Sequence, residues 1–168
     1  MTKKFKTLFP VKSSLISLYI ALTVPIPFIS SENLKIPSVI FFILGLFMII
    51  DITSDYVETC DKKIHYKTNF LSRIFGKKNW EIRWEEIKSI KSLSTSQGSS
   101  VFYFIDDKGN NLLLPQRIED FDIFLDKVKN KTNISTKSIS YISPLWTYKL
   151  LTFLSVLMVV GEISLFLL

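Results

Sequence analysis

The chain has 168 residues, of which 48% are hydrophobic and 21% charged, and its formal net charge is +6. Charged residues are nearly absent from 13–50 and 150–168 and dense from 51 to 137. This segregation excludes a disordered chain, a collagen-like chain and an ordinary soluble enzyme. One cysteine and one histidine exclude a disulfide framework and a Cys/His zinc cluster, so we expect no metal and no other cofactor.

The chain opens with a basic stretch, residues 1–12, and an uncharged segment, residues 13–31, follows. These nineteen residues are enough for a helix across a bilayer core of about 30 Å. Pro25 and Pro27 predict a kink or an end of that helix. A cleaved signal peptide is the alternative, but no small-x-small cleavage site follows and a second apolar segment comes at once. We therefore predict an uncleaved membrane helix.

Two further apolar segments predict two more membrane helices, at about 35–52 and 146–168. The uncharged part of the first, residues 36–50, is short and crosses fully only if the bilayer thins or the helix ends reach the interface. The second begins with Trp146 and Tyr148, which are typical of an interfacial aromatic belt.

Glu162 interrupts the last apolar segment. A carboxylate inside an apolar membrane helix is costly, and such residues often face a partner or a cavity. Glu162 is therefore a candidate for an intramembrane partner contact. The alternative is a tolerated side chain that reaches water near the membrane edge.

The distribution of Lys and Arg predicts the orientation. Four lysines precede the first apolar segment, and sixteen Lys and Arg residues lie in 53–149. We expect the N-terminus and the polar middle to be cytoplasmic, with the C-terminus on the far side.

Residues 53–131 read as a small β-rich domain closed by one helix. Alternation predicts strands at 56–60, 64–70 and 80–84, the last with Trp80, Ile82 and Trp84 toward the core. Another strand is predicted over 87–93, and apolar runs predict a hairpin of 101–105 with 112–114. The turn between the last two, Asp106-Asp-Lys-Gly-Asn-Asn111, has hairpin residues and lacks the full ligand series of a calcium loop. Apolar spacing predicts the helix over 118–128. Residues 132–145 read as a polar linker.

The order of about six strands and one amphipathic helix resembles a pleckstrin-homology-like (PH-like) barrel. Three stretches carry the resemblance: Tyr56-Val-Glu-Thr-Cys-Asp-Lys-Lys-Ile-His-Tyr66, Trp80-Glu-Ile-Arg-Trp-Glu-Glu-Ile-Lys-Ser-Ile90 and Leu112-Leu-Leu-Pro-Gln-Arg-Ile-Glu-Asp-Phe121. Bacterial PH-like domains of small membrane proteins are similar, and two membrane helices often precede them. The resemblance implies an α+β membrane protein, with a helical hairpin, a PH-like barrel with its helix, and a third membrane helix.

The chain also resembles the photosystem I assembly factor of cyanobacteria and plastids, which has two N-terminal membrane helices. Asp61-Lys-Lys63, Phe75-Gly-Lys77 and Glu86-Ile-Lys-Ser-Ile90 carry this likeness. The third membrane segment departs from that pattern. The two resemblances imply a location in a bacterial inner membrane or a thylakoid-type membrane, and the second implies an assembly role in a photosynthetic membrane.

Two groups of cations are candidates for contact with anionic lipid headgroups or a partner. Arg73, Lys77 and Lys78 fall in one predicted loop, and Lys62 and Lys63 in a turn. A cation near an anionic membrane surface contributes about 1 kcal/mol. The alternative is an ordinary solvated loop. Nucleic-acid binding is not expected, because residues 53–149 mix sixteen basic with twelve acidic residues.

No residue pattern predicts catalysis. His65 lies on the polar phase of a predicted strand without a nucleophile at recognisable spacing, and Cys60 reads as a half-buried thiol. We therefore expect a non-enzymatic membrane protein that acts as a scaffold or assembly factor for a membrane protein or complex. The alternative is a sensor of anionic lipid that uses the basic loops.

Overall fold

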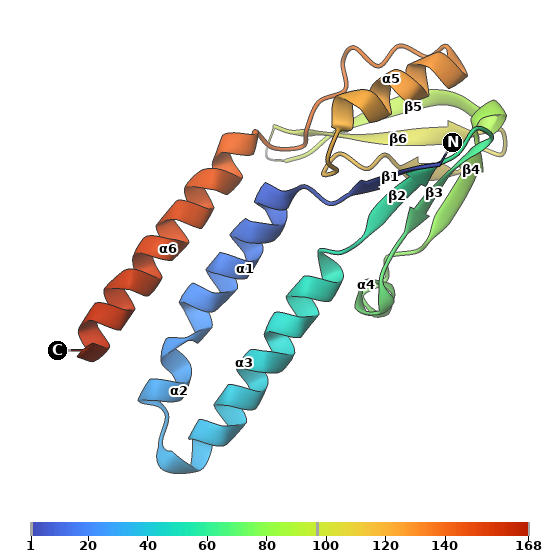
Figure 1. The fold of residues 1–168 in the computed structure, drawn as a ribbon. Coiled ribbons are helices and arrows are strands. Elements are labelled where there is room, and N and C mark those ends of the chain that lie inside the picture. The colour runs from blue at the N-terminus through green and yellow to red at the C-terminus, as the bar shows by residue number, and fades with distance from the viewer. Residues whose placement is uncertain (1, 97, 168) are drawn as a thin grey trace. The chain divides into compact units, whose positions relative to one another are not determined.

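The computed structural model describes residues 2–96 and 98–167, with side chains up to 165. The chain divides into two compact units, each built from segments far apart in sequence. The β unit comprises residues 2–8 and 54–143, and the helical unit comprises 9–53 and 144–167 (Figure 1). The chain therefore passes between the two units three times.

The helical unit contains α1 (Phe9–Thr23), the short α2 (Pro25–Ile29), α3 (Glu32–Ile52) and α6 (Leu145–Leu167). Within the described residues, three spans are long and apolar enough to cross a membrane: Phe9–Ile29, Glu32–Ile52 and Leu145–Leu165. This agrees with the three predicted segments. The first span is divided before Pro25, since proline supplies no N–H to continue the hydrogen-bond ladder of α1.

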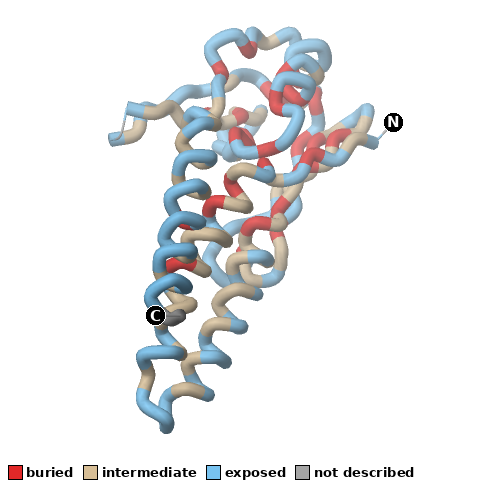
Figure 2. The backbone as a smooth tube through the Cα atoms, turned by 60° about the vertical axis from the view of Figure 1, so that its left-hand side comes forward, coloured by how far each residue is buried: buried red, intermediate tan, exposed pale blue. Residues whose placement is uncertain are grey.

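The second apolar segment forms a longer helix than its uncharged part predicts. The 21 residues of α3 give a length of about 31 Å. Lys35 lies inside the first turns of this helix, where its ammonium pairs with the Glu32 carboxylate at 2.6 Å. Most positions of α3 face outward, and none is buried (Figure 2). Such a surface is suited to lipid.

The helices of the helical unit pack through small side chains. Helix α1 contacts both α3 and α6, and the buried positions include Ser14 and Ala21 on α1 and Ser155 on α6. The hydroxyl of Tyr19 donates a 2.9 Å hydrogen bond to the carbonyl of Phe42 on α3. Gly45 allows this approach, because a Cβ at that position would overlap the Tyr19 hydroxyl.

The β unit holds two antiparallel sheets. The first has the order β1 (Lys3–Lys6), β2 (Tyr56–Thr59), β3 (Lys63–Lys67), β4 (Trp80–Arg83). The second has the order β5 (Ile87–Ser94), β6 (Ser100–Asp106), β7 (Asn111–Leu113). The predicted hairpin of residues 101–105 with 112–114 is present as β6 and β7.

The two sheets do not close into the barrel that the resemblance implies. The 3-10 turn η1 (Trp84–Glu86) separates β4 from β5, and Glu86 bonds back to the Arg83 backbone N–H. At the other end β7 stops before Pro115, which cannot donate to a ladder. In place of a ladder between the sheets, one isolated β-bridge pairs Thr7, just after β1, with Ile118, after β7.

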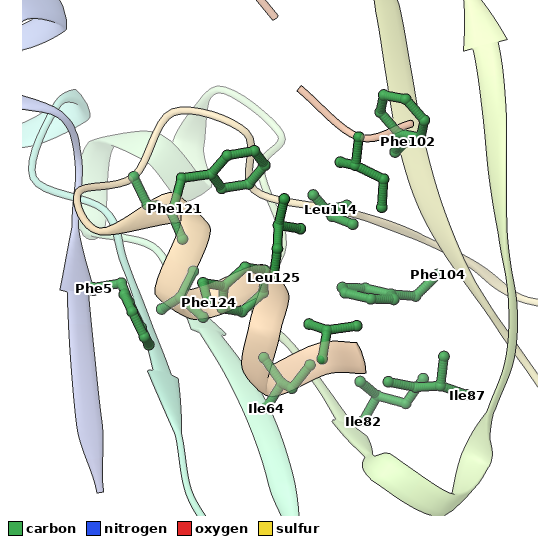
Figure 3. Close-up of a cluster of buried hydrophobic side chains, with 14 of the residues drawn as sticks. Phe5, Ile64, Ile82, Ile87, Phe102, Phe104, Leu114, Phe121, Phe124 and Leu125 are labelled. Carbon is green, nitrogen blue, oxygen red and sulfur yellow. The ribbon is translucent and has the colours of Figure 1, made fainter. Parts of the chain in front are cut away.

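Helix α5 (Phe121–Thr132) covers the inner faces of both sheets. In Figure 3 the ring of Phe124 points toward Phe5 of β1, and Phe104 of β6 lies in the same cluster. The centroids of Phe5 and Phe124 are 5.5 Å apart in an edge-on arrangement. Strand alternation places Phe5, Phe104 and Ile82 inward. Trp84, predicted to face the core, is buried as well, from the 3-10 turn after β4.

Two segments that the sequence reads as polar belong to this fold. Residues 3–6 were expected within a basic tail, yet they form β1, with Phe5 buried between exposed lysines. The predicted linker contributes Ile139 and Tyr141 to the core. Gln116 holds that segment, since its side-chain amide donates to the carbonyls of Ser100 and Ser140 at 3.0 and 2.8 Å.

Candidate functional site

The candidate cations lie at two separate places in the β unit. Lys62 lies in the turn before β3, and Lys63 is the first residue of that strand. The other three cations follow the end of β3: Arg73, Lys77 and Lys78. Strand β3 has five residues, so its first and last residues are four rises of about 3.3 Å, or about 13 Å, apart. The structure therefore does not join the two groups. The Lys63 ammonium is also paired with Glu81 at 3.0 Å.

The second group lies in residues 69–78, which we call the α4 loop. It connects β3 to β4 and contains the short helix α4 (Phe70–Ile74). Strand alternation had been predicted through residue 70, and this is wrong at its end: β3 stops at Lys67 and Phe70 begins α4. Gly76 then adopts a φ of 85°, a left-handed conformation that glycine tolerates, and the chain turns back toward β4.

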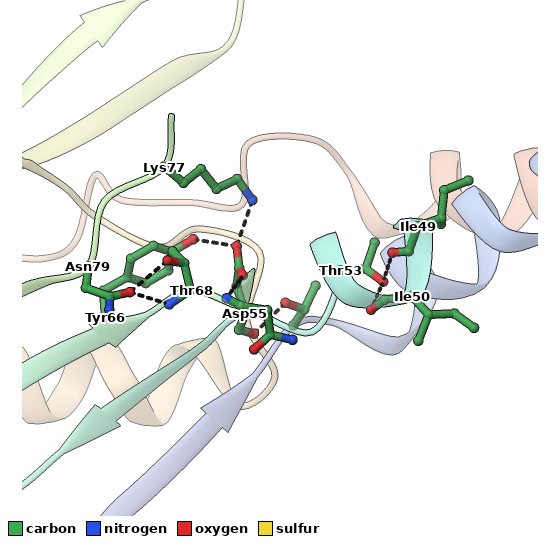
Figure 4. Close-up of polar contacts among 10 residues, drawn as sticks. Ile49, Ile50, Thr53, Asp55, Tyr66, Thr68, Lys77 and Asn79 are labelled. Carbon is green, nitrogen blue, oxygen red and sulfur yellow. Dashed lines mark hydrogen bonds and ion pairs between the residues drawn. The ribbon is translucent and has the colours of Figure 1, made fainter. Parts of the chain in front are cut away.

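The Asp55 carboxylate anchors both ends of the α4 loop (Figure 4). Its side chain is 6% exposed, and it accepts from the backbone N–H of Asn69 at 3.0 Å and from the Lys77 ammonium at 2.7 Å. The Tyr66 hydroxyl donates to the same carboxylate at 3.3 Å. Burial, together with the Asp55 charge, raises the pKa of the Tyr66 phenol above its usual value.

A second pair of hydrogen bonds closes the base of the loop. The side-chain carbonyl of Asn79 accepts from the backbone N–H and from the hydroxyl of Thr68, both at 2.7 Å (Figure 4). Ser72, in the middle of α4, is fully buried. The α4 loop is thus fixed at its base and at its centre by the β unit.

This geometry separates the three predicted cations by role. Lys77 is held by Asp55 and so positions the loop. Arg73 and Lys78 are exposed, and in the described part of the chain neither is in an ion pair. Arg73 and Lys78 are therefore the cations of this loop that are available to an external anion.

Sequence reasoning missed the apolar side chains of the same loop. Phe70, Ile74 and Phe75 are 71%, 63% and 62% exposed. No acidic residue occurs between 69 and 78, so every charged residue of this loop is a cation. The signal was present in the sequence as Phe-Leu-Ser-Arg-Ile-Phe, but the predicted strand was extended through Phe70.

The other candidate residues take structural positions. His65 lies half-buried on the outer face of the first sheet, with Nδ1 3.0 Å from the Glu81 carboxylate. The Cys60 carbonyl accepts from the Trp84 indole at 2.9 Å, and its thiol is half-buried. The Asp106 carboxylate accepts two backbone N–H bonds within the hairpin turn. Among the described residues, no cluster of three or more His, Cys, Asp or Glu is placed to hold a metal.

Glu162 lies on α6, in the helical unit. Its Oε2 atom is buried and, among the residues described, receives no hydrogen bond. The hydroxyl of Tyr148, fourteen residues earlier on the same helix, is also buried and has no hydrogen-bond partner among the described residues. A buried polar atom without a partner is costly, so both positions would gain from an added donor or acceptor.

No protein-family model matches the chain. The chain is similar to an uncharacterized protein, slr0269, of Synechocystis sp. (strain ATCC 27184 / PCC 6803 / Kazusa). The two are 26% identical over 164 residues, which is 94% of this chain and 82% of the relative. The similarity thus extends over both units, and the chain is a distant homologue of a cyanobacterial protein.

Proposed function

We propose that this chain is a non-enzymatic integral membrane protein whose PH-like domain, the β unit, docks on the anionic surface of its own membrane. One observation carries the proposal: Arg73 and Lys78 are exposed on a loop that Asp55 and Asn79 hold in place. Two antiparallel sheets followed by helix α5 support the PH-like assignment, although the sheets stay open. The positive-inside pattern favours a cytoplasmic β unit.

The strength of such docking follows from the two free cations. At about 1 kcal/mol each near an anionic surface, Arg73 and Lys78 together contribute about 2 kcal/mol. That corresponds to roughly a 30-fold change in the ratio of docked to undocked loops. Because exposed charges are screened beyond about 10 Å at 0.1 M salt, docking should weaken as salt rises.

Hydrogen exchange of the full chain in nanodiscs tests this function. With phosphatidylglycerol added to phosphatidylcholine, the backbone of residues 70–76 should become protected. The double variant Arg73→Gln with Lys78→Gln should lose that dependence on anionic lipid. The variant Lys129→Gln with Lys131→Gln removes the same charge from the end of α5 and should behave as wild type. Equal protection in all three proteins would contradict lipid docking.

A second candidate function is a scaffold or assembly factor for a membrane complex. The observation that favours it is the buried Oε2 of Glu162, which lacks a hydrogen-bond donor within the described chain. A donor from a partner helix would satisfy this atom. Purification of the full chain in mild detergent should then recover a stoichiometric membrane protein, and Glu162→Leu should lose it. Recovery of the same partner by the Glu162→Leu variant would remove Glu162 from this role.

A further inference from the structure

The α4 loop exposes more apolar surface than electrostatic docking requires. Among the described residues of the β unit, six large apolar side chains are exposed, and the three on this loop are the most exposed at 62–71%. The other three, Leu93, Leu113 and Ile123, are scattered over separate elements at 47–49%. Single exposed apolar residues are ordinary, whereas a contiguous group marks a binding surface.

The loop presents these side chains from a fixed backbone. The N–H groups of Phe75, Gly76 and Lys77 each donate a 3.0 Å bond to a carbonyl within the loop. The bonds at Asp55 and Asn79 hold its two ends. A rigid loop loses little conformational entropy when it binds, so its apolar area contributes directly to affinity.

The charge of the loop favours a bilayer as the occupant rather than a protein partner of mixed charge. Arg73 lies between Phe70 and Ile74, Lys78 follows Phe75 and Gly76, and no acid occurs in the loop. Apolar side chains flanked by cations are the composition of segments that lie in the headgroup region. The long stem of arginine can lie along apolar surface while its guanidinium reaches a phosphate.

Chain connectivity keeps Asp55, which anchors the α4 loop, near the end of the proposed membrane helix α3. The Thr53 hydroxyl donates to the carbonyl of Ile49 at 2.7 Å, which fixes the end of α3 (Figure 4). Asp55 follows Ile52, the last residue of α3, by three residues. Consecutive Cα atoms are 3.8 Å apart, so these two residues are at most about 11 Å apart.

We infer that Phe70, Ile74 and Phe75 insert into the boundary between lipid headgroups and acyl chains. The ligand of the site is then the bilayer itself, not a soluble headgroup. The inference rests on the proposed lipid-docking function and adds an apolar contribution to it. Arg73 and Lys78 select anionic lipid, and the apolar side chains hold the loop in the interface.

Depth-dependent quenching in proteoliposomes tests the insertion. The full chain carries Cys60→Ser and Ile74→Cys with an environment-sensitive fluorophore, and the vesicles contain lipids with spin labels on the acyl chain. We expect quenching at position 74, and none for the same fluorophore at Lys108→Cys in the β6–β7 turn. Phe70→Asn with Phe75→Asn should lower the inserted fraction at least about tenfold for each ring removed. Leu93→Asn with Ile123→Asn is the matched control and should leave quenching unchanged.

The outcomes distinguish the insertion from the proposed function. Quenching at position 74 that is equal with and without phosphatidylglycerol would keep the insertion and reject anionic selectivity. No quenching, while the Arg73 and Lys78 variants still alter hydrogen exchange, would overturn the insertion and keep the docking function. Shielding of position 74 in native membranes but not in pure lipid would also overturn it, since a protein would then cover the loop. Unchanged tryptophan fluorescence confirms that each variant is folded.

Discussion

Asp55 decides which residues of the candidate site are available for binding. It holds Lys77, Asn69 and Tyr66 through one nearly buried carboxylate. Lys77 therefore contributes to the position of the loop, and its ammonium is not free for an external anion. A buried carboxylate with three donors is expected to tolerate substitution poorly, because each donor loses its partner at once.

Substitution of Asp55 by alanine should loosen the α4 loop. We expect a loss of about 2 kcal/mol in the free energy of local opening, since hydrogen bonds to charged groups contribute about 1.5–3 kcal/mol. Trypsin should then cleave after Arg73, Lys77 and Lys78 faster than in the wild type. Asp107→Ala removes only an exposed carboxylate paired with Lys88 and is the control. Cleavage at the wild-type rate in Asp55→Ala would show that the carboxylate does not hold the loop.

Ion pairs on the outer face of the first sheet make the stability of the β unit dependent on pH. The Lys67 ammonium bonds to the Glu58 carboxylate at 2.8 Å and lowers the pKa of Glu58 below its ordinary 4.5. A carboxyl whose folded-state pKa is lowered stabilises the fold above the unfolded value, and this contribution is lost as pH falls below about 4.5. Glu81, which bonds to Lys63, has a lowered pKa for the same reason.

Substitution Glu58→Gln should flatten the acid limb of the stability curve. The midpoint of urea unfolding, followed by tryptophan fluorescence in detergent, should fall less steeply below about pH 4.5 in the variant. At neutral pH the change should be small, since the pair lies on an exposed face. An unchanged slope in Glu58→Gln would mean that the Lys67 pair does not form in solution.

At the scale of elements, α5 is what joins two sheets that do not close on each other. Its inward side chains meet β1 from the first sheet and β6 from the second. The Phe121 and Phe124 rings stack at 6.4 Å along one side of the helix. The hydrophobic core of the β unit therefore depends on α5 more than the core of a closed barrel would depend on its helix.

Alanine substitutions of Phe124 and Ile123 test whether the core depends on α5. Phe124 is fully buried and Ile123 is 49% exposed. We expect Phe124→Ala to lower the free energy of unfolding by about 3–5 kcal/mol, and Ile123→Ala by under about 1 kcal/mol. Urea titration of the full chain in detergent measures both. Similar losses for the two variants would contradict the packing of α5.

At the scale of the whole molecule, the β unit is connected to the helical unit at three points of the chain. On the proposed function, in which the helical unit crosses a membrane, any surface of the β unit would be confined to the neighbourhood of that membrane. Such confinement raises the effective concentration of lipid, so even a weak loop contact would be occupied.

The orientation of the molecule can be measured with single cysteines in a Cys60→Ser background. From the excess of Lys and Arg in 53–149 we expect Lys108→Cys to react with an impermeant maleimide in inverted vesicles and not in intact cells. Ser31→Cys, between α2 and α3, should give the opposite result. Rapid reaction of Lys108→Cys from outside intact cells would reverse the proposed topology.

Local sequence patterns were sufficient to predict the elements that have a long apolar run, a strand alternation or a helical apolar spacing of their own. The apolar segments predicted three long helices, because a run of about 20 uncharged residues has few other uses. Alternation around Trp80 and Ile82 predicted strand β4 and its buried face. The helix near 118–128 was predicted by apolar spacing and is present as α5 at residues 121–132.

The sequence by itself determined which segments are apolar enough for a membrane and which fold as a mixed domain, since both depend on local composition. Only the tertiary structure decided that residues 3–6 are a strand, because β1 is fixed by pairing with β2, at least fifty residues away. It likewise separated Lys77 from Arg73 and Lys78. These cations are alike in sequence, and their roles differ because the carboxylate of Asp55 lies beside only one of them.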